Sequence, residues 1–126
     1  MAKILIAEDE GDVSYILGEA LKKKGHSVVF AYDGEETLAV ARKENPAMII
    51  LDIMMPKMDG LEVHQELKKD PKTKKIYILI QTAKADIGKF IIENKTYEVD
   101  GFMEKPFELS KLFNMVEDIL KGKKIK

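Results

Sequence analysis

Three carboxylic acids directly follow short apolar runs of the sequence, and they are the first residues whose types point to chemistry. Glu8 and Asp9 come after the run Ile4–Ala7, and Asp52 comes after Met48–Leu51. Runs of this length, rich in Ile and Val, are typical of buried parallel strands. Because function collects at the carboxyl ends of the strands in open parallel sheets, we expect the three acids to converge.

Two further polar residues end apolar runs in the second half of the chain. Thr82 follows Tyr77–Ile80 after one glutamine, and Lys105 follows Gly101–Met103 after one glutamate. Three carboxylates in one partly buried place repel one another, and Lys105 compensates only one of the three charges. One divalent cation would neutralise the remaining −2. Oxygen ligands with open water positions suit Mg²⁺, which also binds phosphate oxygens. The sequence therefore predicts an acid pocket for magnesium and a phosphoryl group.

The elements that must position these residues alternate between strand and helix patterns. A fifth apolar run, Val28–Ala31, completes the strands. Five helices are expected between and after them, and the positions that mark these helices are Val13, Ile16, Leu17, Ala20 and Leu21; the stretch from Glu35 to Asn45-Pro46; Leu61, His64 and Leu67; Ile87, Phe90 and Ile91; and Leu109, Leu112, Phe113, Val116, Ile119 and Leu120. The pattern predicts an α/β fold, a doubly wound (βα)5 parallel sheet in the order 2-1-3-4-5, as in flavodoxin-like proteins.

Length and composition limit the function classes. With 126 residues, of which 45% are hydrophobic, we expect a single domain over residues 1–126. The net charge of −1 does not favour direct nucleic-acid or membrane binding, and the absence of cysteine excludes disulfides and thiolate sites. No signal peptide or membrane-spanning run is visible, so we expect a cytoplasmic location.

Taken together, the motifs resemble one family, the receiver domains of two-component response regulators. They are, in chain order, Glu8-Asp9, the loop Asp52–Gly60, Thr82-Ala83 and Lys105-Pro106-Phe107. The resemblance covers essentially the whole chain, with every motif in order and at a family-like spacing. It implies a receiver fold and a phosphoryl group accepted from a phosphohistidine.

The resemblance also implies a role for each residue. Asp52 would become an aspartyl phosphate, while Lys105 pairs with the phosphoryl oxygens and Thr82 donates a hydrogen bond to one of them. Mg²⁺ would be held by Asp9, by Asp52 and by the backbone carbonyl of Met54, with Glu8 acting through a metal-bound water. Thr82 and Phe102 would form the switch. The domain would catalyse only its own phosphorylation and dephosphorylation, and is not expected to be an enzyme in the wider sense.

The implied partners are a sensor histidine kinase or phosphotransfer protein and a downstream protein. The downstream protein would bind the face formed by the helix near residues 87–91, the strand 101–103 and the last helix. Here the sequence departs from the family, because Glu98 and Val99 replace a usual pair of small residues and Glu93–Tyr97 is polar. We therefore expect the helix near 87–91 to be short or frayed. No DNA-binding segment is present, so the domain either acts alone or belongs to a longer protein.

Three alternatives compete with this interpretation. A pseudo-receiver that is never phosphorylated would lack an acid, the threonine or the lysine, and none is missing. A haloacid-dehalogenase-type phosphatase needs a second acid two residues after the nucleophile, where Met54 stands. A dinucleotide-binding domain needs a glycine-rich turn after the first strand, but the turn here is acidic. His64 has no second histidine near it in the sequence and is expected to be a core or boundary residue.

Overall fold

Five parallel strands form one sheet in the computed structural model, which describes residues 2–83 and 99–122. The strands are β1 (Lys3–Ala7), β2 (Ser27–Ala31), β3 (Met48–Asp52), β4 (Tyr77–Thr82) and β5 (Gly101–Glu104). Their order is β2-β1-β3-β4-β5, and every pairing is parallel. The predicted fold class and strand order are confirmed, and each strand begins and ends within two residues of its apolar run.

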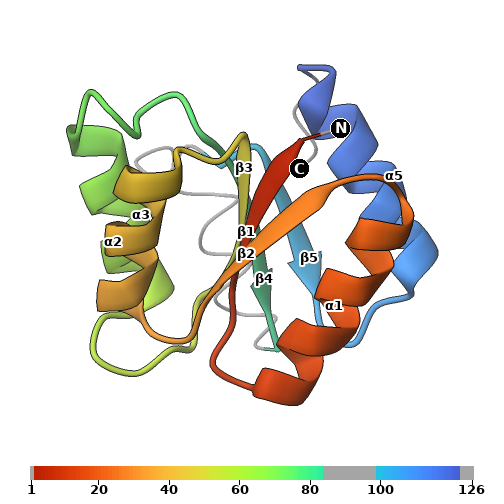
Figure 1. Ribbon diagram of the computed structural model, residues 1–126. Coiled ribbons are helices and arrows are strands. Elements are labelled where there is room, and N and C mark those ends of the chain that lie inside the picture. Colours follow the sequence, from red (N-terminus) through yellow and green to blue (C-terminus); the bar gives the residue numbers. More distant parts are fainter. Residues whose placement is uncertain (1, 84–98, 123–126) are drawn as a thin grey trace.

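The described helices cover both faces of the sheet. They are α1 (Gly11–Lys23), α2 (Gly34–Glu44), α3 (Gly60–Lys69) and α5 (Leu109–Leu120). Helices α1 and α5 lie on one face, and α2 and α3 lie on the other (Figure 1). The helix expected near 87–91 and the polar stretch 93–97 lie outside the described residues. None of the described helices is long and apolar enough to cross a membrane.

Side-chain alternation along the strands separates two cores. Ile6 of β1, Ile50 of β3 and Leu79 of β4 pack in the cluster that contains residues of α1 and α5. Their neighbours in the chain, such as Leu51 and Ile80, pack in the cluster on the α2–α3 side. Because successive side chains of a strand point to opposite faces, this alternation fixes which polar residues share a side at the strand ends.

The apolar face of α1 differs from its prediction at one residue. Ile16 was expected on the core-facing stripe, but its side chain is 56% exposed, and the buried residues of the helix are Ser14, Leu17, Gly18 and Leu21. The reason lies at Gly18, where an added Cβ would stand 2.6 Å from the ring of Phe30. The ring occupies the space beside Gly18, so the helix turns Gly18 inward and Ile16 outward.

The helix ends follow local rules. Asp33 and Asp59 precede α2 and α3, and each side chain accepts a hydrogen bond from the backbone N–H three residues later, as N-caps do. Gly25 has φ = 94° just after α1, and Asn45 ends α2 in the left-handed region, as is common at helix C-termini. His64 is buried on α3, which confirms its prediction as a core or boundary residue.

Candidate functional site

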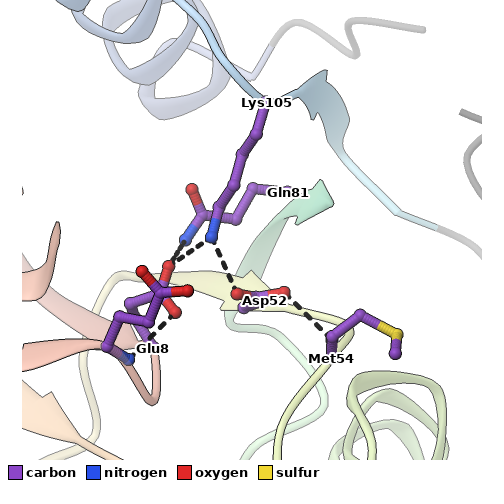
Figure 2. A network of polar contacts seen from close by, with 6 residues as sticks. Glu8, Asp52, Met54, Gln81 and Lys105 are labelled. Atoms are coloured by element: carbon purple, nitrogen blue, oxygen red, sulfur yellow. Dashed lines mark hydrogen bonds and ion pairs between the residues drawn. The ribbon is translucent and has the colours of Figure 1, made fainter. Parts of the chain in front are cut away.

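The predicted acids and lysine meet at the carboxyl edge of the sheet (Figure 2). Glu8 follows β1, Asp52 ends β3 and Lys105 follows β5. The Lys105 ammonium lies 2.5 Å from Glu8 Oε1 and 2.9 Å from Asp52 Oδ2, so it bridges the two carboxylates. Glu8, Asp52 and Lys105 each come two residues after a residue of the α1–α5 core, namely Ile6, Ile50 and Met103. Because side chains two residues apart on a strand point to the same face, all three lie on the α1–α5 side.

Burial and neighbouring charges shift the pKa values of Glu8 and Lys105. Glu8 has no exposed surface, and burial raises its pKa to about 7, an effect that the Lys105 hydrogen bond opposes and the neighbouring Asp52 carboxylate reinforces. Burial alone would lower the pKa of Lys105, but its hydrogen bonds to Glu8 and Asp52 outweigh this effect and raise the pKa. Lys105 is therefore a permanent cation of the pocket, whereas Glu8 changes charge near neutral pH.

Asp9 completes an oxygen-rich cluster. One carboxylate oxygen each from Glu8, Asp9 and Asp52 lie within 4.8 Å of one another, and Asp9 is exposed while the other two are buried. Asp52 Oδ1 also accepts a 2.9 Å hydrogen bond from the backbone N–H of Met54. This donor fixes the orientation of the carboxylate. The Met54 side chain is 46% exposed at the edge of the pocket.

The loop after Asp52 is closed by tight backbone contacts. The Gly60 N–H donates to the carbonyl of Ile53 at 2.8 Å. A Cβ on Gly60 would lie 2.6 Å from Ile53 Cα and 2.7 Å from the Asp52 carbonyl oxygen, so only glycine fits without a backbone shift. Asp59 then starts α3 as its N-cap. The loop residues thereby hold Asp52 in place from its C-terminal side.

The two predicted switch residues belong to the other face of the sheet. Thr82 ends β4 and is fully buried. It comes two residues after Ile80, which packs in the α2–α3 core, so its side chain points to the same face of the sheet. Phe102 pairs with Ile80 across the β4–β5 ladder and packs, partly buried, against the α2–α3 core. The Thr82 carbonyl accepts a 2.8 Å hydrogen bond from the Lys105 N–H, which joins the end of β4 to the acid pocket.

One pocket residue was not predicted from the sequence. Gln81 pairs with Asp52 in the β3–β4 register, is fully buried, and directs its amide nitrogen to Glu8 Oε1 at 3.5 Å. A signal existed, because Gln81 is a polar residue two places after Leu79 and directly follows the apolar run Tyr77–Ile80. Alternation from Leu79 would have placed it beside Asp52.

A family model decides what this arrangement is. The model described as "Response regulator receiver domain" matches residues 4–117. The chain belongs to the response regulator receiver domain family. The expected membership of the receiver domains of two-component response regulators is therefore confirmed.

The relatives differ in how much of their own length this receiver domain matches. Protein PilH of Pseudomonas aeruginosa is 33% identical over 97% of this chain and 100% of its own length. The alkaline phosphatase synthesis transcriptional regulatory protein PhoP of Bacillus subtilis is 36% identical over 98% of this chain but 50% of its own. The probable transcriptional regulator ycf27 of Porphyridium aerugineum is 35% identical, again over about half of its length (48%). The chain thus spans all of PilH and about half of the transcriptional regulators.

Solved structures agree with the receiver fold. A putative response regulator from Chloroflexus aurantiacus has a TM-score of 0.86 at 32% identity, with 95% of this chain and 98% of that chain covered. The chemotaxis response regulator CheY4 of Vibrio cholerae has a TM-score of 0.86 at 30% identity, with 94% and 98% covered.

Proposed function

We propose that this receiver domain accepts a phosphoryl group from a phosphohistidine onto Asp52 in a magnesium-dependent reaction and thereby changes its binding to a downstream protein. The observation that carries the proposal is the setting of Asp52. The residue is 4% exposed, and its carboxylate is held by the Lys105 ammonium and the Met54 N–H and lies beside the Glu8 and Asp9 oxygens.

The transfer needs little covalent chemistry from the protein. An Asp52 carboxylate oxygen forms a bond to phosphorus while the P–N bond of phosphohistidine breaks, and the electron pair stays on the imidazole nitrogen, which takes up a proton. Lys105 lies beside the attacking carboxylate and is placed to pair with the transferred oxygens. Thr82 would donate its hydroxyl to one of them. Positioning and charge neutralisation are the protein's share of such a reaction.

The donor set fits magnesium. The three acids offer carboxylate oxygens within 4.8 Å of one another, and Mg²⁺ prefers such oxygens while keeping several waters. We propose Asp9, Asp52 and the Met54 carbonyl as ligands, with Glu8 acting through water. When bound, the ion neutralises charge on the phosphoryl oxygens. In a calorimetric titration, Asp9→Ala should weaken Mg²⁺ binding strongly and Glu8→Ala less. Unchanged affinity of Asp9→Ala would contradict this ligand assignment.

An apolar groove beside Lys105 provides a surface for the phosphodonor. It has a volume of about 320 Å³, Lys105 lies at its edge, and its apolar lining consists of Val13, Ile16, Leu17, Pro106, Phe107 and Leu109. Ile16 and Leu109 are exposed, although their spacing is that of core residues. We propose that the histidine kinase or phosphotransfer protein packs its apolar surface here, which brings its phosphohistidine to Asp52.

Comparing a protein phosphodonor with a small-molecule phosphodonor separates binding at the groove from the chemical step at Asp52. Ile16→Asp should slow transfer from a phosphorylated histidine protein at least tenfold but leave phosphorylation by acetyl phosphate unchanged, because the small donor needs no groove. Ala39→Asp, on the exposed side of α2, is the matched control and should slow neither reaction. Equal rates of transfer from the histidine protein to Ile16→Asp and to the unaltered domain would remove the groove from the proposal.

The pseudo-receiver alternative is not supported, because every residue that a pseudo-receiver would lack is present and Asp52 and Lys105 are in contact.

We further propose that the domain catalyses only its own phosphorylation and dephosphorylation. Acetyl phosphate with Mg²⁺ should add one phosphoryl group, detected by intact-mass spectrometry. Asp52→Asn and EDTA should each prevent it, whereas Asp12→Asn, which removes an exposed acid of α1, should not. Labelling of Asp52→Asn equal to that of the unaltered protein would refute the phosphoacceptor assignment.

We propose that the readout is protein binding at the face that includes β5 and α5. Phe102 lies on β5, and the last part of that face, near residues 87–91, lies outside the described residues. Direct nucleic-acid or membrane binding is not part of the proposal, since the net charge is −1. We expect the reaction to take place in the cytoplasm, where histidine phosphorylation by ATP can supply the donor.

A further inference from the structure

Gln81 carries a buried amide at a position of β4 where packing alone would favour an apolar side chain. Its side chain has no exposed surface, and its Oε1 has no hydrogen-bond partner among the described residues. Leaving such an oxygen unsatisfied costs about 1–3 kcal/mol. Its Nε2 points to Glu8 Oε1, while the amide oxygen points away from Glu8 (Figure 2). The amide nitrogen is therefore the group that gives Gln81 a role in the pocket.

Glu8 depends on three donors in this arrangement. Its Oε1 accepts from Lys105 Nζ and from Gln81 Nε2, and its Oε2 accepts from the Glu10 N–H at 3.3 Å. Lys105 is shared with Asp52. Once Asp52 carries a phosphoryl group, three more oxygens compete for the same ammonium. A buried carboxylate is disfavoured when a charged partner turns away, so the donors that remain to Glu8 gain weight; in the proposed function these are the metal-bound water, the Glu10 N–H and the Gln81 amide.

We propose that Gln81 is a positioning residue that keeps Glu8 hydrogen-bonded while Lys105 turns to the phosphoryl group. The inference rests on the proposed phosphorylation of Asp52 and assigns a residue that the family motifs leave out. The Gln81 Nε2 to Glu8 Oε1 distance of 3.5 Å is long for a hydrogen bond, and the same Glu8 oxygen also accepts from Lys105. Since Gln81 Oε1 has no partner among the described residues, no hydrogen bond to them holds the amide back. It can close on Glu8 as Lys105 leaves.

Gln81→Met tests this role, because methionine has nearly the same shape and no hydrogen-bonding amide. Beryllofluoride with Mg²⁺ serves as the probe, standing in for the phosphoryl group on Asp52, and its affinity is measured by NMR titration. We expect Gln81→Met to weaken beryllofluoride binding about tenfold, the value of one modest hydrogen bond to a charged group. Affinity for Mg²⁺ alone should stay within about twofold, because Lys105 still bridges the acids in that state. A purely structural defect would weaken both.

Two variants serve as controls. Leu79→Met makes the same residue two places earlier, on the same face of β4, and should leave both affinities unchanged. Gln81→Asn keeps the amide but shortens the side chain by one methylene, so it should lose the contact and behave like Gln81→Met. Urea unfolding of each variant shows that it is folded under the conditions of the titration.

A double-mutant cycle with Glu8→Gln decides whether Gln81 acts through Glu8. In the Glu8→Gln background there is no buried charge to hold, so Gln81→Met should cause no further loss of beryllofluoride affinity. A full tenfold loss in that background would overturn the proposal, as would equal affinities of Gln81→Met and the unaltered domain. Failure of the unaltered domain to bind beryllofluoride would instead refute the proposed function, and the role of Gln81 with it.

Discussion

Replacing Asp52 with asparagine should change how the stability of the metal-free protein depends on pH. The pKa of Glu8 lies at about 7 in the folded protein, above its ordinary value of 4.5. The folded state therefore holds the Glu8 proton more tightly than the unfolded chain, and the stability from this group is complete below about pH 4.5. It is lost as the pH rises to about 7. A pKa difference of this size corresponds to about 3 kcal/mol.

The position of Asp52 gives its share of that cost. The Glu8 and Asp52 oxygens lie within 4.8 Å of each other, and two negative charges at that distance repel by about 3.5 kcal/mol at an effective permittivity of about 20. Burial, the largest cause of the raised Glu8 pKa, is unchanged by Asp52→Asn, and the Lys105 hydrogen bond, which lowers the pKa, offsets part of the repulsion from Asp52. We therefore expect the variant to recover roughly 2 kcal/mol of the pH-dependent loss, within the range of single substitutions.

Urea unfolding in EDTA at about pH 5 and about pH 8 measures this effect. The free energy of unfolding of Asp52→Asn, relative to the unaltered protein, should rise by roughly 2 kcal/mol between the two conditions. Asp12→Asn makes the same chemical change at an exposed acid of α1, outside the pocket, and is the matched control for the loss of one carboxylate. Parallel pH profiles for Asp52→Asn and the unaltered protein would refute the reasoning, because Asp52 would then have no influence on Glu8.

Three further predictions concern the pocket and the switch. Gly60→Ala forces a Cβ against Ile53 Cα at 2.6 Å and should cost about 1–3 kcal/mol in thermal unfolding, whereas Gly11→Ala, with nothing within 4 Å, should cost nothing by packing. Met54→Asn should speed loss of phosphate from Asp52, followed by mass spectrometry, because the exposed apolar side chain cannot orient a water and an amide can; an unchanged lifetime would remove Met54 from the hydrolysis argument. Addition of beryllofluoride should move the NMR signals of Phe102, and changes confined to the acid pocket would contradict a switch through Thr82 and Phe102.

Much of the fold and most of the pocket were predictable because they depend on local patterns. Apolar runs placed the five strands, and the chain order of the acids and Lys105 placed them at one edge of the sheet. The prediction for Ile16 was wrong because the spacing of apolar residues predicts which residues share a helix face, but not how the helix is rotated against the sheet. Its exposure is decided by the Phe30 ring beside Gly18, a contact between α1 and β2 that spacing within one helix does not contain.

Gln81 shows the second limit of prediction from sequence. Its type and position are visible in the chain, but its role depends on the register of β4 against β3 and on a Glu8 oxygen that Lys105 also uses. The charge of Glu8 is equally hard to predict from sequence, because its pKa depends on burial, and the residues next to it in the chain do not indicate that burial. Contacts between segments far apart in the sequence set both properties.

Gln81 and Thr82 are adjacent in β4, but their side chains leave opposite faces of the sheet, so the two proposed activities would use different sides of the domain. In the proposed function, the phosphodonor binds on the side of α1 and Lys105, and the proposed switch residue Phe102 packs on the opposite side. The two sides meet through the backbone at the ends of β4 and β5, where Lys105 binds the Thr82 carbonyl. Exchanging groove residues such as Ile16 for those of another receiver should therefore redirect the domain to a new kinase without altering how its output responds, which makes it suited to the rewiring of signalling circuits.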